Sequence, residues 1–325
     1  MEHNLAVNQI SVGVVGLGLM GSSIVAALLI AGHPVVAIAP LPVDMELAPQ
    51  RIADQLRHCE KAALLSHAPA DYLAQLTVTD DYSQLQECRL VLECVIENLA
   101  IKETVYQKIE AVVSPEAVIA SNTSAIPISI LQHYISRPER FLGIHWAEPA
   151  YMTRFMEITC GDQTAMPYAD WAFQLAHEWQ KEPTLLRKDI RGFVTNRLMY
   201  AIYREALHLI DTEEASMEDV DKAFRYDVGS WVTLMGIFRR LDYLGLQDFS
   251  EIFKNLFPKL SNDDRVPAVM QRMIDLKARG TQSVQGLYDY TDEEARRWDE
   301  AFAVFNQDIY QLAAQYPAVR ENQKP

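Results

Sequence analysis

Short apolar runs alternate with longer segments of helical composition through the first 190 residues of the chain. Val12–Val15 is rich in β-branched residues and predicts a buried strand of a parallel sheet, and a second strand is expected over residues 35–39. The segment between them is rich in Ala and Leu and ends at Gly32, a residue type that commonly follows a helix. This strand–helix–strand order predicts an α/β sheet.

The alternation continues downstream and then stops. Helices are expected over residues 44–65 and 100–113, and buried strands are expected in "LVLECV", "AVIASNTS" and "FLGIHW". After about residue 190, "GFVTNRLMYAIYREALHLIDTEE" has apolar residues at helical spacing, and strand signals become sparse. We therefore predict a Rossmann-like, doubly wound sheet domain over residues 1–190 and an all-α C-terminal domain over residues 191–325.

A glycine-rich stretch, "GLGLMG", directly follows the first predicted strand and opens the first predicted helix. Gly16 permits the tight turn, Gly18 lets a pyrophosphate approach the backbone, and Gly21 lets the helix pack closely on the strand. The helix N-terminus then offers N–H groups to phosphate oxygens. The context predicts a dinucleotide-binding loop with cofactor contacts at Gly16, Gly18, Met20 and Gly21.

Two further polar stretches follow predicted strands. "SNTS", residues 121–124, lies where ligands bind in open parallel sheets, although Ser and Thr at such a place also cap helices. His145 ends the strand "FLGIHW", and Glu157 lies on the next apolar run, "FMEI". A histidine beside a carboxylate can abstract a proton from an alcohol, although each residue also occurs as an ordinary structural or solvated group.

Taken together, these stretches resemble the L-3-hydroxyacyl-CoA dehydrogenase family in order and spacing over nearly the whole chain. The matching stretches are "GLGLMG", "LVLECVIENLAIKETVYQKIE", "IASNTSAIPI", "GIHWAEPAYMTRFMEI", "RGFVTNRL", "DYLGL" and "GLYDYT". The resemblance implies an N-terminal Rossmann-like domain, a C-terminal helical domain that usually forms a homodimer, and a role in fatty acid metabolism.

The resemblance also implies roles for individual residues. His145 matches the catalytic base and Glu157 its orienting partner, while Ser124 matches a serine that contacts both substrate and nicotinamide. Asn196 matches the asparagine that helps to position the reacting group. The implied reaction moves a hydride from C3 of a 3-hydroxy substrate to the nicotinamide while His145 takes the hydroxyl proton.

The cofactor side of the resemblance is incomplete. Glu97 and Lys102 match residues that hold the nicotinamide side of NAD, but Ala39 stands where the family has its ribose-binding Asp. No Lys or Arg follows Ala39 to hold a 2′-phosphate, and Asp44 is a candidate to reach back to the ribose. We therefore expect NAD as the cofactor, with weaker discrimination at the adenosine ribose.

The substrate side departs from the family as well. Glu148, in "HWAEP", replaces a neutral amide, and Arg154 lies inside the same segment. An arginine there suits a free carboxylate, although it can equally form a surface salt bridge. Ala62, next to Lys61, stands where the family has a basic residue that contacts coenzyme A, and Gln282 lies near the place of another. Glu148 and Arg154 therefore join Ser124 and Asn196 as candidate substrate contacts.

We predict one function, with two alternatives. The prediction is NAD-dependent oxidation of a 3-hydroxyacyl-CoA, or the reverse reduction, by an enzyme of that family. The first alternative is dehydrogenation of a free 3-hydroxy acid or sugar acid, such as gulonate or carnitine. The second alternative is a non-catalytic binding protein on the same scaffold, against which the combination of Ser124, His145, Glu157 and Asn196 argues.

Composition narrows the surroundings of the protein. The chain of 325 residues has a formal net charge of −15 and no basic block, which argues against a nucleic-acid partner. Its four cysteines lack metal-site spacing and are typical of reduced thiols. The first ten residues lack a signal-peptide core, and the apolar run at residues 24–31 is too short to span a membrane. We expect a cytoplasmic protein with a small-molecule substrate, no metal and no membrane partner.

Overall fold

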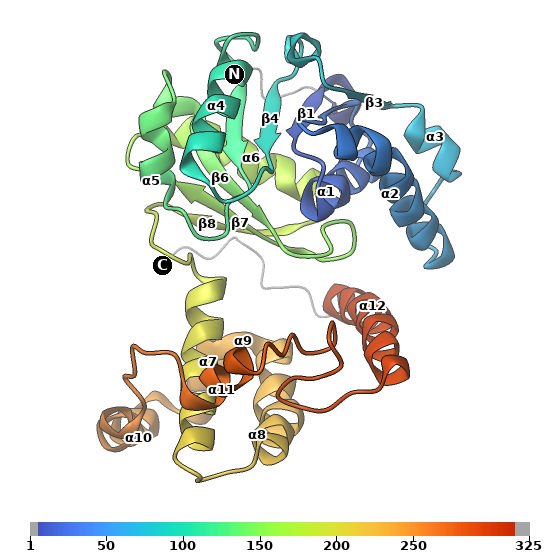
Figure 1. The fold of residues 1–325 in the computed structure, drawn as a ribbon. Helices are drawn as coiled ribbons and strands as arrows, with labels where there is room; N and C mark the ends of the chain where they lie inside the picture. Colours follow the sequence, from blue (N-terminus) through green and yellow to red (C-terminus); the bar gives the residue numbers. More distant parts are fainter. Residues whose placement is uncertain (1–5, 316–325) are drawn as a thin grey trace. The chain divides into compact units, whose positions relative to one another are not determined.

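A computed structural model describes residues 6–315 and divides the chain between Phe193 and Val194 into two compact units. The first, which we call the α/β unit, is built on one sheet of eight strands in the order β3-β2-β1-β4-β5-β6-β7-β8 (Figure 1). Neighbouring strands are parallel except for the antiparallel pair β6 and β7. The strands are β1 (Val12–Val15), β2 (Val35–Ile38), β3 (Leu76–Thr79), β4 (Leu90–Glu93), β5 (Val118–Ser121), β6 (Phe141–Trp146), β7 (Phe155–Cys160) and β8 (Glu182–Leu186).

Helices cover both faces of this sheet because its strands are apolar on both sides. Val12 and Val14 of β1 belong to a core with α1, α2 and α6, whereas Val15 belongs to a second core with α4 and α5. The predicted α/β class and doubly wound arrangement are confirmed. The helices of this unit are α1 (Leu19–Ile30), α2 (Pro42–Lys61), α3 (Pro69–Leu73), α4 (Leu99–Glu110), α5 (Ile128–Leu131) and α6 (Met166–Glu178).

Several predicted bounds need correction. The strand expected over residues 90–95 ends at Glu93, and the helix expected over 44–65 starts at Pro42 and ends at Lys61. The strands β3 and β8 were not predicted. Both lie at the ends of the sheet, where half-exposed residues and, in β8, Glu182 and Pro183 weaken the apolar pattern.

The second unit, which we call the helical unit, is all-α among its described residues. A π-helical turn at Phe224–Val228 joins α8 to α9, and α9 bends at Gly236, whose φ is 73°. None of the residues of α7, α8, α9 and α10 is buried. The helices are α7 (Thr195–Asp211), α8 (Met217–Ala223), α9 (Gly229–Leu244), α10 (Leu246–Leu256), α11 (Ala268–Asp275) and α12 (Asp292–Gln315).

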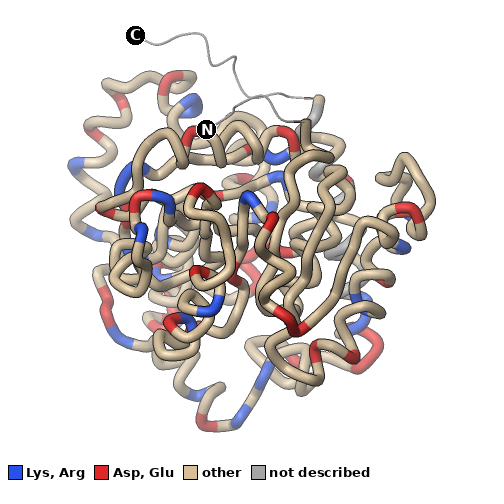
Figure 2. Tube along the Cα trace, turned by 90° about the horizontal axis from the view of Figure 1, so that it is seen from above, with Lys and Arg blue, Asp and Glu red and all other residues tan. Residues whose placement is uncertain are grey.

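Charged positions are interspersed along the chain rather than gathered in one basic stripe (Figure 2). Across residues 6–315, no helix is both long enough and apolar enough to cross a membrane.

Candidate active site

The glycine loop between β1 and α1 has the geometry that a dinucleotide needs. Gly16 has φ of 94°, and a Cβ on Gly21 would lie 1.8 Å from the Gly16 carbonyl oxygen, so neither position accepts a side chain without a shift. A Cβ on Gly18 would meet nothing within 4 Å, which leaves that part of the backbone open to an approaching ligand. Gly18 also precedes the first turn of α1, where no side chain caps the helix N–H groups. These features fit the pyrophosphate of NAD.

The end of β2 offers no charged group to the adenosine ribose. Ala39 is buried, and exposed Pro40 and Leu41 follow it. The structure places Asp44 in the first turn of α2, half-buried, and gives it no side-chain contact toward Ala39. The predicted reach of Asp44 to the ribose stays a prediction.

A buried ionic cluster lies at the end of β4, and the sequence did not predict it. Glu93 is completely buried, and its carboxylate accepts hydrogen bonds from Lys102 at 2.7 and 2.9 Å. Tyr106 and Ser121 each donate a further hydrogen bond at 2.7 Å, and the Val95 N–H donates another at 2.8 Å. Burial and the neighbouring carboxylate raise the pKa of Tyr106 well above its usual value, so the phenol stays a donor. A carboxylate with this many donors is stable without water.

The cluster continues to Glu97 and the "SNTS" stretch. The Lys102 ammonium lies 3.4 Å from a Glu97 oxygen, although the lysine side chain is only 1 % exposed. The other Glu97 oxygen accepts hydrogen bonds from the Thr123 hydroxyl at 2.7 Å and the Ser124 N–H at 2.8 Å. Lys102 thus lies on the buried side of Glu97, and Glu97 holds the backbone of Ser124 in place. The alternative of a helix cap is not seen, because Pro127 precedes α5.

His145 and Glu157 are cross-strand neighbours on β6 and β7. The histidine Nδ1 lies 3.0 Å from Glu157 Oε2, and Glu157 is completely buried. On the other side of the ring, Nε2 lies 3.2 Å from the hydroxyl of exposed Ser124. Phe193, also buried, packs against the imidazole with ring centroids 5.7 Å apart. This aromatic neighbour, which the sequence did not identify, limits where the ring can move.

The structure places the remaining predicted substrate residues in different surroundings. Arg154 forms an ion pair with Glu182 at 2.5 Å, the arrangement that the salt-bridge alternative describes. Glu148 is exposed on the loop between β6 and β7. Asn196 lies in the first turn of α7, in the helical unit, and its contact with a reacting group stays a prediction.

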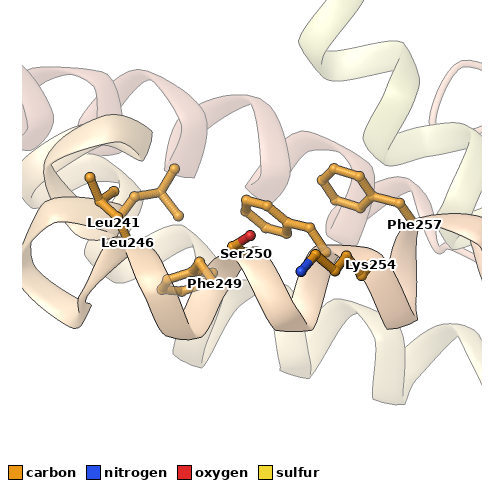
Figure 3. A pocket seen from close by; sticks show the side chains of 7 residues that line it. Leu241, Leu246, Phe249, Ser250, Lys254 and Phe257 are labelled. Atoms are coloured by element: carbon orange, nitrogen blue, oxygen red, sulfur yellow. The ribbon is translucent and has the colours of Figure 1, made fainter.

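Two hollows are lined by residues other than His145 and Glu157. One of about 420 Å³ lies on the helical unit and is apolar apart from Ser250 and Lys254 (Figure 3), so it lacks an acid/base pair. Another, of about 470 Å³, lies on the α/β unit beside the loop between β6 and β7. It is lined by Leu47, Gln50, Arg51, Asp54, Gln55, His58 and Tyr151.

Known proteins of similar sequence are named as dehydrogenases. The chain is 32% identical over 290 residues to 5-formyl-3-hydroxy-2-methylpyridine 4-carboxylate 5-dehydrogenase of Mesorhizobium japonicum, covering 88% of this chain and 92% of the relative. It is 30% identical to L-carnitine dehydrogenase of Oceanobacillus iheyensis, covering 81% and 88%.

Solved structures of dehydrogenases are similar to this chain as well. The crystal structure of the pyridine-carboxylate 5-dehydrogenase, described as an NAD⁺-dependent dismutase, matches with a TM-score of 0.87 and 29% identity, covering 94% of this chain and 99% of that one. (S)-3-hydroxybutyryl-CoA dehydrogenase from Ralstonia eutropha matches with a TM-score of 0.72 and 27% identity, covering 86% and 99%.

Family models match almost the whole described chain. Residues 11–190 match the NAD binding domain of 3-hydroxyacyl-CoA dehydrogenase, and residues 192–290 match its C-terminal domain. The glycine loop fits the cofactor that the first of these domains binds. The chain is an NAD-dependent oxidoreductase and belongs to the 3-hydroxyacyl-CoA dehydrogenase family.

Proposed function

We propose that His145 is the acid/base of this dehydrogenase and that Glu157 orients it. One observation carries the proposal: the imidazole is held between a fully buried carboxylate on Nδ1 and the exposed Ser124 hydroxyl near Nε2. A carboxylate on Nδ1 keeps the proton there and leaves the Nε2 lone pair facing the ligand side. This is the tautomer that a general base requires.

The roles of the side chains follow from this arrangement. Bound at the glycine loop, NAD would supply the hydride acceptor for the carbon that carries the substrate hydroxyl. His145 takes the hydroxyl proton at Nε2, and Glu157 stabilises the imidazolium that forms. Ser124 and, by the family resemblance, Asn196 orient the reacting oxygen. In the reverse direction, protonated His145 donates the proton to the carbonyl oxygen.

We propose a small free carboxylic acid as the substrate class. The relatives named for a pyridine carboxylate and for carnitine support it. The solved structure of the pyridine-carboxylate dehydrogenase also matches this chain with a higher TM-score than that of 3-hydroxybutyryl-CoA dehydrogenase. Ala62 and Gln282 stand where the resemblance expects cationic groups for coenzyme A. Arg154, which exchanges Glu182 for the substrate carboxylate, is the proposed anchor.

A 3-hydroxyacyl-CoA remains the second candidate. It is favoured by the family models and by the similarity to 3-hydroxybutyryl-CoA dehydrogenases over most of the chain. Affinity would then come mainly from the nucleotide tail, and Arg154 would be peripheral.

The test is a side-by-side assay of NADH formation or consumption. The panel consists of 3-hydroxybutyryl-CoA, L-carnitine, gulonate and 5-formyl-3-hydroxy-2-methylpyridine 4-carboxylate. Turnover of one or more free acids, with the thioester slower, supports the proposed class. Turnover of the thioester alone establishes the second candidate, and no turnover of any compound with NAD bound contradicts a catalytic role on these classes.

We also propose that the protein is a homodimer that associates through its helical unit. The helices α7, α8, α9 and α10 bury no residue, although several large apolar side chains lie on them. Phe238 is 81 % exposed, and Tyr226 and Tyr243 are each 75 % exposed. Apolar surface on this scale is typical of a face that a second subunit covers. The apolar hollow in Figure 3 lies on the same unit.

A further inference from the structure

The loop over residues 147–154 joins the strand of His145 to the strand of Glu157, so its shape decides what lies beside the acid/base pair. Polar side chains hold its backbone from several directions. The Thr153 hydroxyl donates to the carbonyls of Ala147 and Pro149 at 2.8 and 3.0 Å. The Ala150 N–H donates to the buried Ser23 hydroxyl of α1 at 2.8 Å.

Two further hydrogen bonds to the backbone of this loop come from Lys181, which lies between α6 and β8. Its ammonium donates to the carbonyl of Ala150 at 2.6 Å and to that of Thr153 at 2.5 Å. The same ammonium lies 5.5 Å from the centre of the Trp146 ring, and the residue is only 6 % exposed. Among the residues that the structure describes, both hydrogen-bond acceptors of this lysine are neutral carbonyls.

We infer that Lys181 is a positioning residue that orders the 147–154 loop and so sets the affinity for the organic substrate. A charged donor binds a carbonyl about twice as strongly as a neutral one. Protonated Lys181 therefore holds the loop more firmly than neutral Lys181. The inference rests on the proposed function in one respect, namely that this loop contacts the substrate.

The surroundings make this contact sensitive to protonation. Burial and, to a lesser extent, the charge of Arg154 together lower the pKa of Lys181 to about 7, against an opposing effect of Cys59 of α2. The other titratable groups of the loop and of the start of β8 are Glu148, which is exposed, Tyr151, which contacts His58 of α2, and Glu182, which is paired with Arg154. Burial raises the pKa of Tyr151 to about 12 and that of Cys59 to about 12, so both stay neutral near pH 7. Of Lys181, Tyr151 and Cys59, Lys181 is then the one whose charge changes near pH 7.

The experiment compares Lys181→Met with Lys188→Met, a control on the exposed segment after β8. At about pH 6.5 we expect Lys181→Met to raise the KM of the turned-over panel compound about tenfold, with kcat and NADH affinity within about twofold, because only loop contacts are lost. At about pH 8.5 the ratio of the two KM values should fall toward one, since the lysine of the parent is then mostly neutral. A KM ratio that is the same at both pH values, or a loss in kcat alone, overturns the inference.

A second readout needs neither substrate nor a folded variant. Hydrogen exchange of the 147–154 amides, expressed as protection factors, should weaken in the parent as pH rises through about 7, while residues 118–121 of β5 keep their protection. Protection of the loop that does not change with pH contradicts the role of Lys181. Loss of protection with no panel turnover would leave the loop inference standing and count against the proposed function.

Discussion

The two units of this chain differ in which side chains they bury: the α/β unit buries several charged side chains, whereas the helical unit exposes large apolar ones. In the α/β unit, charged side chains such as Glu93, Lys102 and Glu157 lie at or near zero exposure, each beside a partner of opposite charge or a hydrogen-bond partner. In the helical unit, Phe238 and Tyr243 are exposed, and α7 to α10 bury no residue. The first unit holds the His145–Glu157 pair, whereas the second leaves large apolar side chains exposed.

The largest expected effect tests the buried polar groups of the α/β unit. Glu93→Gln removes the nearer of the two carboxylates beside the buried Lys102 ammonium and leaves Glu97, at 3.4 Å, as the more distant one, and breaking such a buried pair typically costs about 3–5 kcal/mol of unfolding free energy. Denaturant titration should show this loss, and Lys102→Met added to Glu93→Gln should recover most of it. The exposed substitution Glu116→Gln is the control. Equal stability of Glu93→Gln and the parent would show that the cluster contributes nothing.

The next effect tests the helical unit. Phe238→Asp places a charge on the exposed face of α9 and should weaken self-association by about 2 kcal/mol or more, the size of effect seen at interface hot spots. Sedimentation at several concentrations measures it, with Asp242→Asn on the same helix as the control. A parent that sediments as a monomer at every concentration would refute the proposed dimer.

A smaller effect is expected at the end of β2. Ala39→Asp supplies the acid that this edge lacks and should tighten NAD binding by about 1 kcal/mol, the worth of a hydrogen bond or two. It should weaken NADP binding through repulsion of the 2′-phosphate. Fluorescence titration of both reduced cofactors measures both changes. A clear preference of the parent for NADP would contradict our expectation of NAD.

The smallest effect concerns the proposed carboxylate anchor. Arg154 and Glu182 form a partly exposed ion pair, and such pairs contribute about 0.2–1 kcal/mol. Glu182→Gln removes the competitor, so the KM of a free acid should fall by up to about fivefold, while that of 3-hydroxybutyryl-CoA stays unchanged. Arg154→Ala should raise the KM of the acid. If neither substitution changes the KM of the free acid, Arg154 is excluded as the carboxylate anchor.

The sequence predicted the parts of this molecule that local patterns encode. The buried strand Val12–Val15, the glycine loop and the change to helices near residue 190 all follow from residue type and spacing. His145 and Glu157 were identified as a possible pair, and the antiparallel register of β6 and β7 places them opposite each other.

Other features depend on contacts that spacing does not encode. Glu93, inside the apolar run "LVLECV", was a detectable signal, because a charge in a buried strand requires a partner. Which partners it has, Lys102, Tyr106 and Ser121, depends on how α4 and β5 pack. The pairing of Arg154 with Glu182 and the contact of Phe193 with His145 likewise arise from tertiary structure.

The most direct test of the central claim is the single-turnover rate of NADH formation in His145→Gln, with the exposed His133→Gln as control. We predict a fall of roughly two to four orders of magnitude, the usual contribution of a positioned acid/base group, with thermal stability and NADH affinity unchanged. An unchanged rate in His145→Gln would contradict the assignment of His145 as the acid/base.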